Sequence, residues 1–306
     1  MFNPGNHILI TGSHRSGTTW VGRTISQHSK VEYLHEPFNV DHPNPRLGLK
    51  LNIWFTHYES SDQKEYIRAT FDKFLKANSF SYILNLSKPM DRRFINLLRY
   101  PNDLILKTLF RPRVLIKDPI ALLSAGWLHE MYNLQVVCMI RNPLAFVGSL
   151  KKACWDFRFE NLLRQKELMQ GCLASFAGEI EKLSDYRGDF IDRASLLWNV
   201  LHYCIAEYQK KYPSWLFIRY EDIAMNPIQE FEKIFHYLEL EMNENIGHYI
   251  AKYTSDKNKT ETEVTSYGPR DSKASLGTWK TRLTSDECDR IDKATRDIAA
   301  LFYEAE

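Results

Sequence analysis

Short apolar runs recur along the chain and are separated by longer stretches of mixed character. Five of these runs predict strands, at Ile8–Ile10, around Val31–Leu34, and at Val114–Ile116, Gln135–Ile140 and Trp215–Arg219. Their length and their β-branched residues are typical of parallel strands that are covered on both faces. The pattern therefore predicts a buried parallel sheet.

Helices are predicted between these strands from apolar residues at helical spacing. Thr18–His28, Pro119–Tyr132 and Leu144–Lys152 each follow a strand, and Ala194–Gln209 presents one apolar face that includes Leu197. Strands that alternate with helices indicate an α/β fold with right-handed crossovers. Because no repeat, low-complexity tract or linker interrupts the alternation, we interpret residues 1–306 as a single domain.

Two segments, residues 39–113 and 154–193, interrupt this alternation. The first opens with a proline-rich loop and then places Ile67 and Phe71 on one helical face, while the second is charged and helical. Ligands of parallel sheets bind beyond the carboxyl ends of the strands, where insertions contribute to substrate sites. We therefore expect the insertions to form the acceptor side of a site, with the charged stretch Phe157–Glu167 as a solvated helix face.

Composition narrows the classes of protein that fit this pattern. A chain of 306 residues with 44% hydrophobic and 25% charged residues can bury a large core, and a formal net charge of +2 argues against a nucleic-acid partner. The five cysteines show no CxxC spacing, no apolar run approaches the roughly 20 residues of a transmembrane segment, and no signal peptide precedes the first strand. We expect a soluble, cytoplasmic protein with reduced thiols. The sequence predicts no oligomeric state.

The segment HILITGSHRSGTTWVG, residues 7–22, has the layout of a phosphate-binding loop. An apolar strand leads into a loop bounded by Gly12 and Gly17, and a helix follows. The backbone N–H groups of such a loop and the helix dipole favour an anion, to which the Thr18 and Thr19 hydroxyls can donate. Arg15 adds a guanidinium that can bind two oxygens at once.

Two features distinguish this loop from that of a nucleotide hydrolase. Thr18 replaces the lysine expected after the second glycine, and the strand Gln135–Ile140 ends in Arg141, where a magnesium-binding aspartate is expected. We therefore predict a metal-independent site whose positive charge comes from side chains.

The stretch SHRSGTTWV resembles the 5′-phosphosulfate loop of sulfotransferases that use 3′-phosphoadenosine 5′-phosphosulfate (PAPS). A second stretch, VVCMIRNPLAFVGSL, is similar to the 3′-phosphate motif of that family, with an arginine at a strand end and a serine two turns into the next helix. The resemblance implies a P-loop NTPase-like fold and two anion sites, one on each side of a ribose. It implies that PAPS is bound by Arg15, Ser16, Gly17, Thr18, Thr19, Arg141 and Ser149.

Three further stretches match the family in the expected order. FIRYEDI, which contains Tyr220, resembles the segment where a tyrosine lies near the adenine, and IKDP, which contains Lys117, is similar to the KDP or KTP of bacterial and tyrosylprotein members. GPRDSKASLGTWKTRLT resembles the C-terminal loop that closes over the 3′-phosphate, with Arg270 and Lys273 as the expected donors. Trp20 either stacks on the adenine or belongs to the core.

Sulfuryl transfer needs in-line positioning, a base for the acceptor hydroxyl, and positively charged groups beside the departing phosphate oxygen. Arg15 and Lys117 are the candidates for these positive charges. Glu36, at a strand end, matches the glutamate held to be the base in tyrosylprotein and several carbohydrate sulfotransferases. His35 is an alternative base, because cytosolic members of the family use a histidine, and His57 is another. A further alternative is that Glu36 is structural and forms a salt bridge with Arg15. Adjacent strand residues point to opposite faces, so we expect only one of His35 and Glu36 to face the donor.

The leading hypothesis is a PAPS-dependent sulfotransferase that releases adenosine 3′,5′-bisphosphate. The resemblance favours a hydroxyl of a carbohydrate or glycolipid as acceptor, with a small-molecule alcohol, phenol or polyketide as the alternative. A P-loop nucleotide kinase is a second hypothesis, which would require the missing lysine and aspartate. A catalytically inactive nucleotide-binding protein is a third, and the intact set of candidate residues argues against it.

Overall fold

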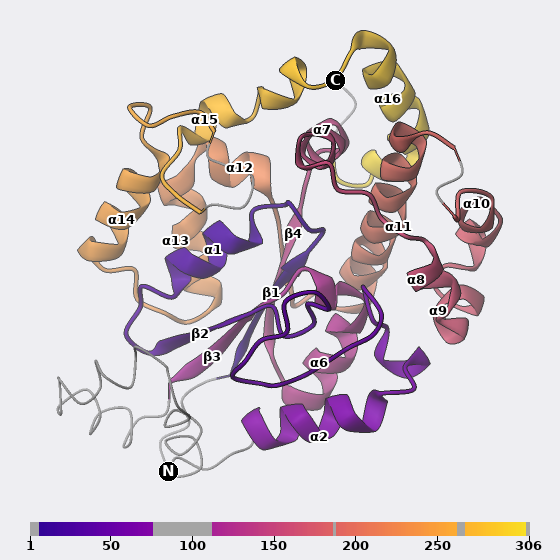
Figure 1. The fold of residues 1–306 in the computed structure, drawn as a ribbon. Coiled ribbons are helices and arrows are strands. Elements are labelled where there is room, and N and C mark those ends of the chain that lie inside the picture. Colours follow the sequence, from indigo (N-terminus) through magenta and orange to yellow (C-terminus); the bar gives the residue numbers. More distant parts are fainter. Residues whose placement is uncertain (1–5, 76–111, 186–187, 262–266, 304–306) are drawn as a thin grey trace.

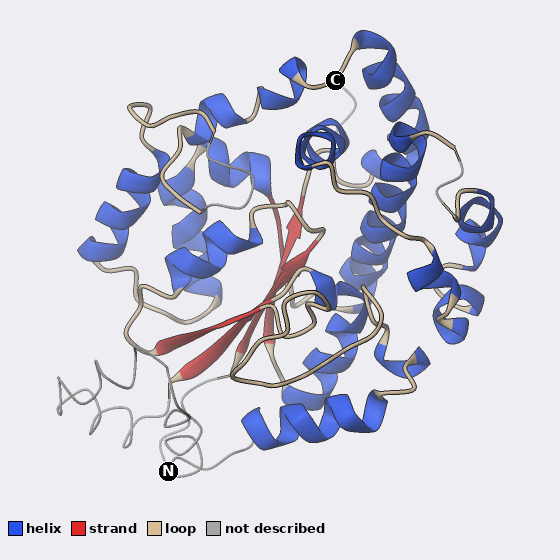
Figure 2. Ribbon diagram, viewed as in Figure 1, coloured by secondary structure: helices blue, strands red, loops and turns tan. Residues whose placement is uncertain are grey.

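Five parallel strands form the central sheet in the order β2-β3-β1-β4-β5 (Figure 2). The structure is a computed structural model that describes residues 6–75, 112–185, 188–261 and 267–303. The predicted strands are all present, and the phosphate loop follows the central strand, as expected for a P-loop-like α/β fold. Their bounds are β1 (Ile8–Gly12), β2 (Val31–His35), β3 (Arg113–Lys117), β4 (Gln135–Ile140) and β5 (Leu216–Arg219).

Alternate residues of a strand enter different apolar clusters on the two faces of the sheet. Ile8 and Ile10 lie in a cluster with residues of α1 (Thr18–Ile25). Leu9, between them, lies in a cluster with residues of α2 (Lys64–Leu75). Both faces are therefore covered, which is why the strands read as continuous apolar runs.

Helices flank the sheet on both sides (Figure 1). With α1, the helices on one face are α12 (Tyr220–Met225), α13 (Pro227–Tyr237) and α14 (Glu244–Thr254). With α2, the helices on the other are α6 (Ala125–Tyr132), α7 (Pro143–Ala153) and α11 (Phe190–Lys211). The remaining α-helices of the described ranges are α8 (Glu160–Leu163), α9 (Lys166–Gln170), α10 (Ala177–Lys182), α15 (Ser272–Ser275) and α16 (Ser285–Ala299).

The predicted helices are present with changes of extent. α1 ends at Ile25 rather than at His28, and the predicted helix after β3 is divided, with a 3-10 turn at Ile120–Ser124 before α6. α11 begins earlier than predicted, at Phe190, because the carboxylate of Asp189 caps it by accepting a backbone N–H at 3.1 Å. Among the described residues, no helix is long and apolar enough to cross a bilayer.

The two insertions are joined by hydrogen bonds. Gln165, in the second, donates to the Phe55 carbonyl at 3.1 Å and accepts from the His57 N–H at 2.6 Å, both in the first. The charged residues Arg164, Lys166 and Glu167 of the second insertion are exposed, as predicted, but the same stretch also buries Phe157 and Leu162 in the core. Residues 76–111, which form much of the first insertion, lie outside the described residues.

Candidate functional site

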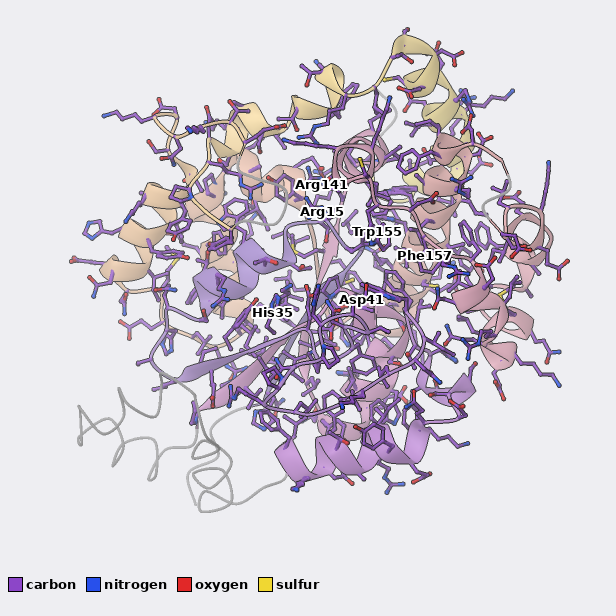
Figure 3. The ribbon with its side chains drawn as sticks, viewed as in Figure 1. Arg15, His35, Asp41, Arg141, Trp155 and Phe157 are labelled. Carbon is purple, nitrogen blue, oxygen red and sulfur yellow. The ribbon has the colours of Figure 1, made fainter. Side chains whose placement is uncertain are left out.

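The predicted site residues gather at the carboxyl ends of the strands. In the sheet register His35 of β2 lies opposite Lys117 of β3, and the loop that contains Arg15 follows β1 between β3 and β4. Figure 3 shows Arg15 and Arg141 close together at this edge, with His35 on one side of them and Trp155 on the other. Parallel strands bring these segments together because their carboxyl ends share one edge.

Backbone geometry explains the two glycines of the phosphate loop. Gly17 has a φ of 85° and Gly12 a φ of 128°, which side chains rarely tolerate. A Cβ on Gly17 would meet the Tyr220 ring, and one on Gly12 would meet the backbone of Met139. The Ser16 hydroxyl donates to a carbonyl within the loop, so Ser16 holds the shape of the loop.

The loop opens directly into the first turn of α1. Gly17 is the N-cap and has no side chain with which to accept the first N–H groups of the helix. Thr18, which is buried, and Thr19, which is half-buried, occupy this turn. The positive end of the helix dipole is therefore directed at the loop, as an anion site requires.

Three of the predicted anion-binding residues are in direct contact. Arg15 Nε donates to Ser149 Oγ at 3.1 Å, and Arg141 Nη1 donates to the Arg15 carbonyl at 3.1 Å. These bonds join the loop after β1 to the end of β4 and to α7, two segments far away in the sequence. The two predicted phosphate sites therefore adjoin one another.

Positive charge is concentrated around Arg15. Burial lowers the pKa of the Arg15 guanidinium, and the charges of Arg141, Arg270 and Arg282 lower it further. Such mutual repulsion among arginines is relieved by a bound anion. Within the described ranges, no group of three or more His, Cys, Asp or Glu side chains could hold a metal ion.

The C-terminal loop contributes to this charge differently from the prediction. Two arginines of this region, Arg270 and Arg282, lower the pKa of Arg15 through their charges. Lys273 is exposed and instead lines a cavity of about 580 Å³ beside α13, whose lining includes none of these arginines. The difference arises because side chains in an irregular loop follow no repeating pattern along the sequence, so their directions are not predictable from spacing.

Arg141 is held between the Tyr-Glu-Asp segment and the loop. Its Cζ lies 3.8 Å from the centroid of the Tyr220 ring, and its Nε lies 3.8 Å from Glu221 Oε1. Tyr220 is only 3% exposed, so its ring supports Arg141 from within the protein. Trp20 contacts the edges of Tyr220 and Phe231, with ring centroids 6.0 and 5.5 Å apart, which favours the core alternative for Trp20.

Two residues of α11 that the sequence did not indicate hold the backbone of Arg141. Trp198 Nε1 donates to the Arg141 carbonyl at 2.8 Å, and the Arg141 N–H donates to His202 Nε2 at 3.3 Å. Burial lowers the pKa of His202 to about 3, so its ring is neutral and Nε2 can accept. The only sequence signal is the i, i+4 spacing of the two side chains, which places them on one helix face without naming a partner.

Glu36 and Lys117 form an ion pair at neighbouring strand ends. Lys117 Nζ donates to Glu36 Oε1, and the Glu36 N–H donates to the Lys117 carbonyl at 2.8 Å. The Lys117 side chain is 1% exposed and that of Glu36 is 18% exposed. Burial is the largest single influence on Glu36 and opposes its ionisation. The charge and hydrogen bond of Lys117, with smaller contributions from His35 and Asn39, together outweigh burial, so the pKa of Glu36 is lowered.

The side chains of His35 and Glu36 do not diverge as predicted. Glu36 has a φ of 39°, in the left-handed region, so the extended alternation ends at His35. As a result His35 Nε2 lies 3.9 Å from Glu36 Oε2, while His35 Nδ1 is hydrogen-bonded to the Tyr33 hydroxyl at 3.1 Å. Burial, followed by the charge of Lys117, lowers the pKa of His35 to about 4. The geometry therefore brings both candidate bases to one point.

Asp118 connects the turn after Glu36 to the end of β3. Its Oδ2 accepts the Phe38 N–H at 2.6 Å, and its Oδ1 accepts the N–H groups of Ile120 and Ala121 at 2.9 and 3.1 Å. Burial raises the pKa of Asp118 to about 7. This carboxyl group orients backbone rather than substrate.

His57, the third candidate base, is engaged within its own segment. Its Nδ1 is hydrogen-bonded to Ser60 Oγ at 3.0 Å, and its Nε2 lies 3.1 Å from Glu59 Oε2. Both ring nitrogens are therefore occupied by neighbours in sequence.

Aromatic side chains from both insertions surround one residue of the phosphate loop. The His14 ring lies 4.4 Å from that of Trp155 and 5.6 Å from that of Phe55, measured between centroids. Trp54 contacts Trp155 at 6.0 Å. Neither ring nitrogen of His14 has a hydrogen-bond partner among the described residues, and burial lowers its pKa to about 3. The insertions thus meet the loop through an apolar, aromatic cluster.

Comparison with known proteins supports the resemblance. Residues 7–244 match the pattern described as the sulfotransferase family. Carbohydrate sulfotransferase 1 of Danio rerio is 24% identical over 348 residues, covering 95% of this chain and 76% of that protein, and that of Mus musculus is 22% identical, covering 96% and 78%. Among solved structures, the sulfotransferase domain from the curacin biosynthetic pathway covers 100% of both chains at 16% identity with a TM-score of 0.45. Mouse sulfotransferase SULT7A1 complexed with PAP covers 97% of this chain and 84% of that chain at 15% identity with a TM-score of 0.42.

Proposed function

Because this chain belongs to the sulfotransferase family, we propose that it transfers the sulfuryl group of PAPS to an acceptor hydroxyl and releases adenosine 3′,5′-bisphosphate. The observation that carries the proposal is the contact between a buried ammonium, Lys117, and a carboxylate, Glu36, beside an arginine-rich phosphate loop. A base and cations arranged at one edge of the sheet are what sulfuryl transfer requires.

The donor is bound by the loop and the arginine cluster. Arg15, with Gly17, Thr18 and Thr19, binds the 5′-phosphosulfate in the loop whose shape Ser16 holds, and Arg141 with Ser149 binds the 3′-phosphate. Three observations support this fit: the glycines that keep the loop free of side chains, the mutual repulsion of the arginines, and the buried Nε of Arg141, which has no hydrogen-bond partner in the described part of the chain. Arg270 and Arg282 add charge from the C-terminal loop.

In the proposed reaction Glu36 accepts the proton of the acceptor hydroxyl. Its lowered pKa keeps it ionised at neutral pH, which a general base requires. Lys117 and Arg15 provide the positive charge that stabilises the departing phosphate oxygen. Because Lys117 is paired with Glu36, this proposal assigns one ammonium both to the base and to the departing phosphate.

A saccharide or glycolipid is the acceptor class that we propose. The relatives from Danio rerio and Mus musculus are named carbohydrate sulfotransferase 1, and aromatic residues such as Trp54 and Trp155 lie where the insertions meet the loop. Aromatic rings beside polar groups suit a ligand with apolar faces and polar edges. A small alcohol, phenol or polyketide is the competing class.

The proposal is tested with Glu36→Gln. This variant is expected to bind adenosine 3′,5′-bisphosphate with unchanged affinity, measured by calorimetry, and to lose on the order of 10²-fold or more of its turnover with labelled PAPS. Near-normal turnover would transfer the role of base to His35. A screen of the wild-type protein against saccharides, glycolipids, phenols and polyketide-like alcohols identifies the acceptor, and label found only on the last two classes would refute the saccharide proposal.

A further inference from the structure

We infer that Asn39 is a positioning residue, whose side-chain amide holds the Glu36 carboxylate in the orientation needed to take a proton. The inference rests on the proposed role of Glu36. Asn39 is the first residue of the first insertion and lies three residues after Glu36, in the turn that follows β2.

Asn39 is fully engaged between Glu36 and the following loop. Its Nδ2 donates to Glu36 Oε2 at 2.7 Å, and its backbone N–H donates to the Glu36 carbonyl at 3.2 Å. Its Oδ1 accepts the N–H groups of Asp41 and His42 at 3.1 and 2.9 Å. The residue is 8% exposed, so water competes little for these bonds.

The two oxygens of Glu36 therefore have different anchors. Lys117 binds Oε1 and Asn39 binds Oε2, which fixes the rotation of the carboxylate about its terminal torsion. This torsion is broad in an unrestrained glutamate, so a second anchor is needed to define it. In the proposed reaction Lys117 also serves the departing phosphate, and Asn39 is the neutral donor that is left to hold the carboxylate alone. Glu36 itself lies in a left-handed conformation, so its backbone is constrained as well.

Several charged or titratable groups face Glu36 from the surrounding elements. Lys117 and Asp118 come from β3 and its end, His35 and Tyr33 from β2, and Arg15 from the phosphate loop. Asn39 contributes no charge. It favours the ionised form of Glu36 through a hydrogen bond alone.

The test replaces the amide donor without removing the loop acceptor. Asn39→Asp keeps an oxygen for the N–H groups of Asp41 and His42, but sets a second carboxylate against Glu36. Asn44→Asp is the matched control. Asn44 lies in the same loop and is also 8% exposed, and its Oδ1 accepts the Arg46 N–H, but its Nδ2 donates to the His35 carbonyl at 2.5 Å.

Asn39→Asp is expected to raise the pKa of Glu36 by about one unit or more. The acidic limb of the plot of kcat against pH should move upward by the same amount. The pKa is measured by carbon-13 NMR on the full chain, with the Glu36 signal assigned through its loss in Glu36→Gln, and this readout needs no acceptor. Asn39→Ala is expected to lower kcat roughly tenfold while the affinity for adenosine 3′,5′-bisphosphate stays within about twofold. Asn44→Asp is expected to leave both the limb and the pKa in place.

Equal shifts in Asn39→Asp and Asn44→Asp would overturn the inference, because a shared loop effect would then explain them. So would an unmoved Glu36 titration in Asn39→Asp together with normal kcat in Asn39→Ala. If Glu36→Gln retains turnover, the proposed base is wrong, whatever the Asn39 variants do. The two failures are therefore distinguishable. Asn39→Ser, which keeps a hydroxyl donor, provides a second variant in case the aspartate does not fold.

Discussion

Removing the charge of Glu36 should destabilise the folded protein as well as stop catalysis. The reason is Lys117, which is 1% exposed and would be left as a buried cation without a charged partner in Glu36→Gln. Breaking a buried ion pair on one side typically costs about 3–5 kcal/mol. Glu36 is 18% exposed and glutamine still offers an oxygen to Lys117, so we take the low end, about 3 kcal/mol. At about 2 °C per kcal/mol for a chain of this size, Tm should fall by about 6 °C.

The assay is a double-mutant cycle with Lys117→Met, which removes the buried charge and keeps much of the side-chain volume. Unfolding in urea at pH 7.5 is followed by tryptophan fluorescence, for which the chain has seven reporters. The double variant should recover about 2 kcal/mol relative to the sum of the single losses, because neither charge then remains unpaired. Glu59→Gln is the control: its carboxylate is 55% exposed, so the free energy of unfolding should change by less than about 0.5 kcal/mol.

Two results would refute this reasoning. A Glu36→Gln protein as stable as the wild type would mean that Lys117 reaches water or another anion in the folded state. A double variant whose loss equals the sum of the single losses would mean that the two side chains do not interact in solution, whatever their geometry. The first result would also weaken the proposed sharing of Lys117 between Glu36 and the departing phosphate.

Three further predictions concern the anion site and the core beside it. Arg141→Ala should weaken binding of adenosine 3′,5′-bisphosphate by more than about 2 kcal/mol in calorimetry, because its buried guanidinium is proposed to bind the 3′-phosphate; unchanged affinity would remove that assignment. His202→Phe keeps a ring on Trp198 but leaves the Arg141 N–H without its acceptor, so the free energy of unfolding should fall by about 1–3 kcal/mol and the bisphosphate should raise Tm less than in the wild type; a full ligand shift would contradict the proposed support of Arg141. Burial lowers the pKa of His14 in the folded protein to about 3, so the contribution of its neutral ring to stability is complete above pH 6.5 and is lost as the pH falls from 6.5 toward 3. In His14→Phe the free energy of unfolding should therefore decline less between pH 6.5 and 5, by about 2 kcal/mol, and an unchanged slope would show that His14 is not the group responsible.

Local sequence patterns were enough to predict the sheet and the loop. The strands are buried on both faces, so each reads as an apolar run that ends where its chemistry begins, as Ile8–Gly12 ends at the phosphate loop. The two loop glycines are likewise local signals, because their positive φ values exclude most other residues. The carboxyl ends of parallel strands share one edge, so the sequence alone assigns Arg15, Arg141 and Lys117 to that edge, although it does not give the order of the strands.

The sequence by itself thus determined the α/β fold and the strand ends at which the site is built, because burial and backbone sterics act on neighbouring residues. Only the tertiary structure decided how the side chains at those ends are paired. The partner of Glu36 is 81 residues away in Lys117, and the group that holds the Arg141 carbonyl is 57 residues away in Trp198. It also brought His35 to Glu36 through one left-handed residue. Such contacts depend on how whole helices and strands pack against each other. Packing depends on the shapes and volumes of side chains across the molecule, and no local sequence pattern encodes these.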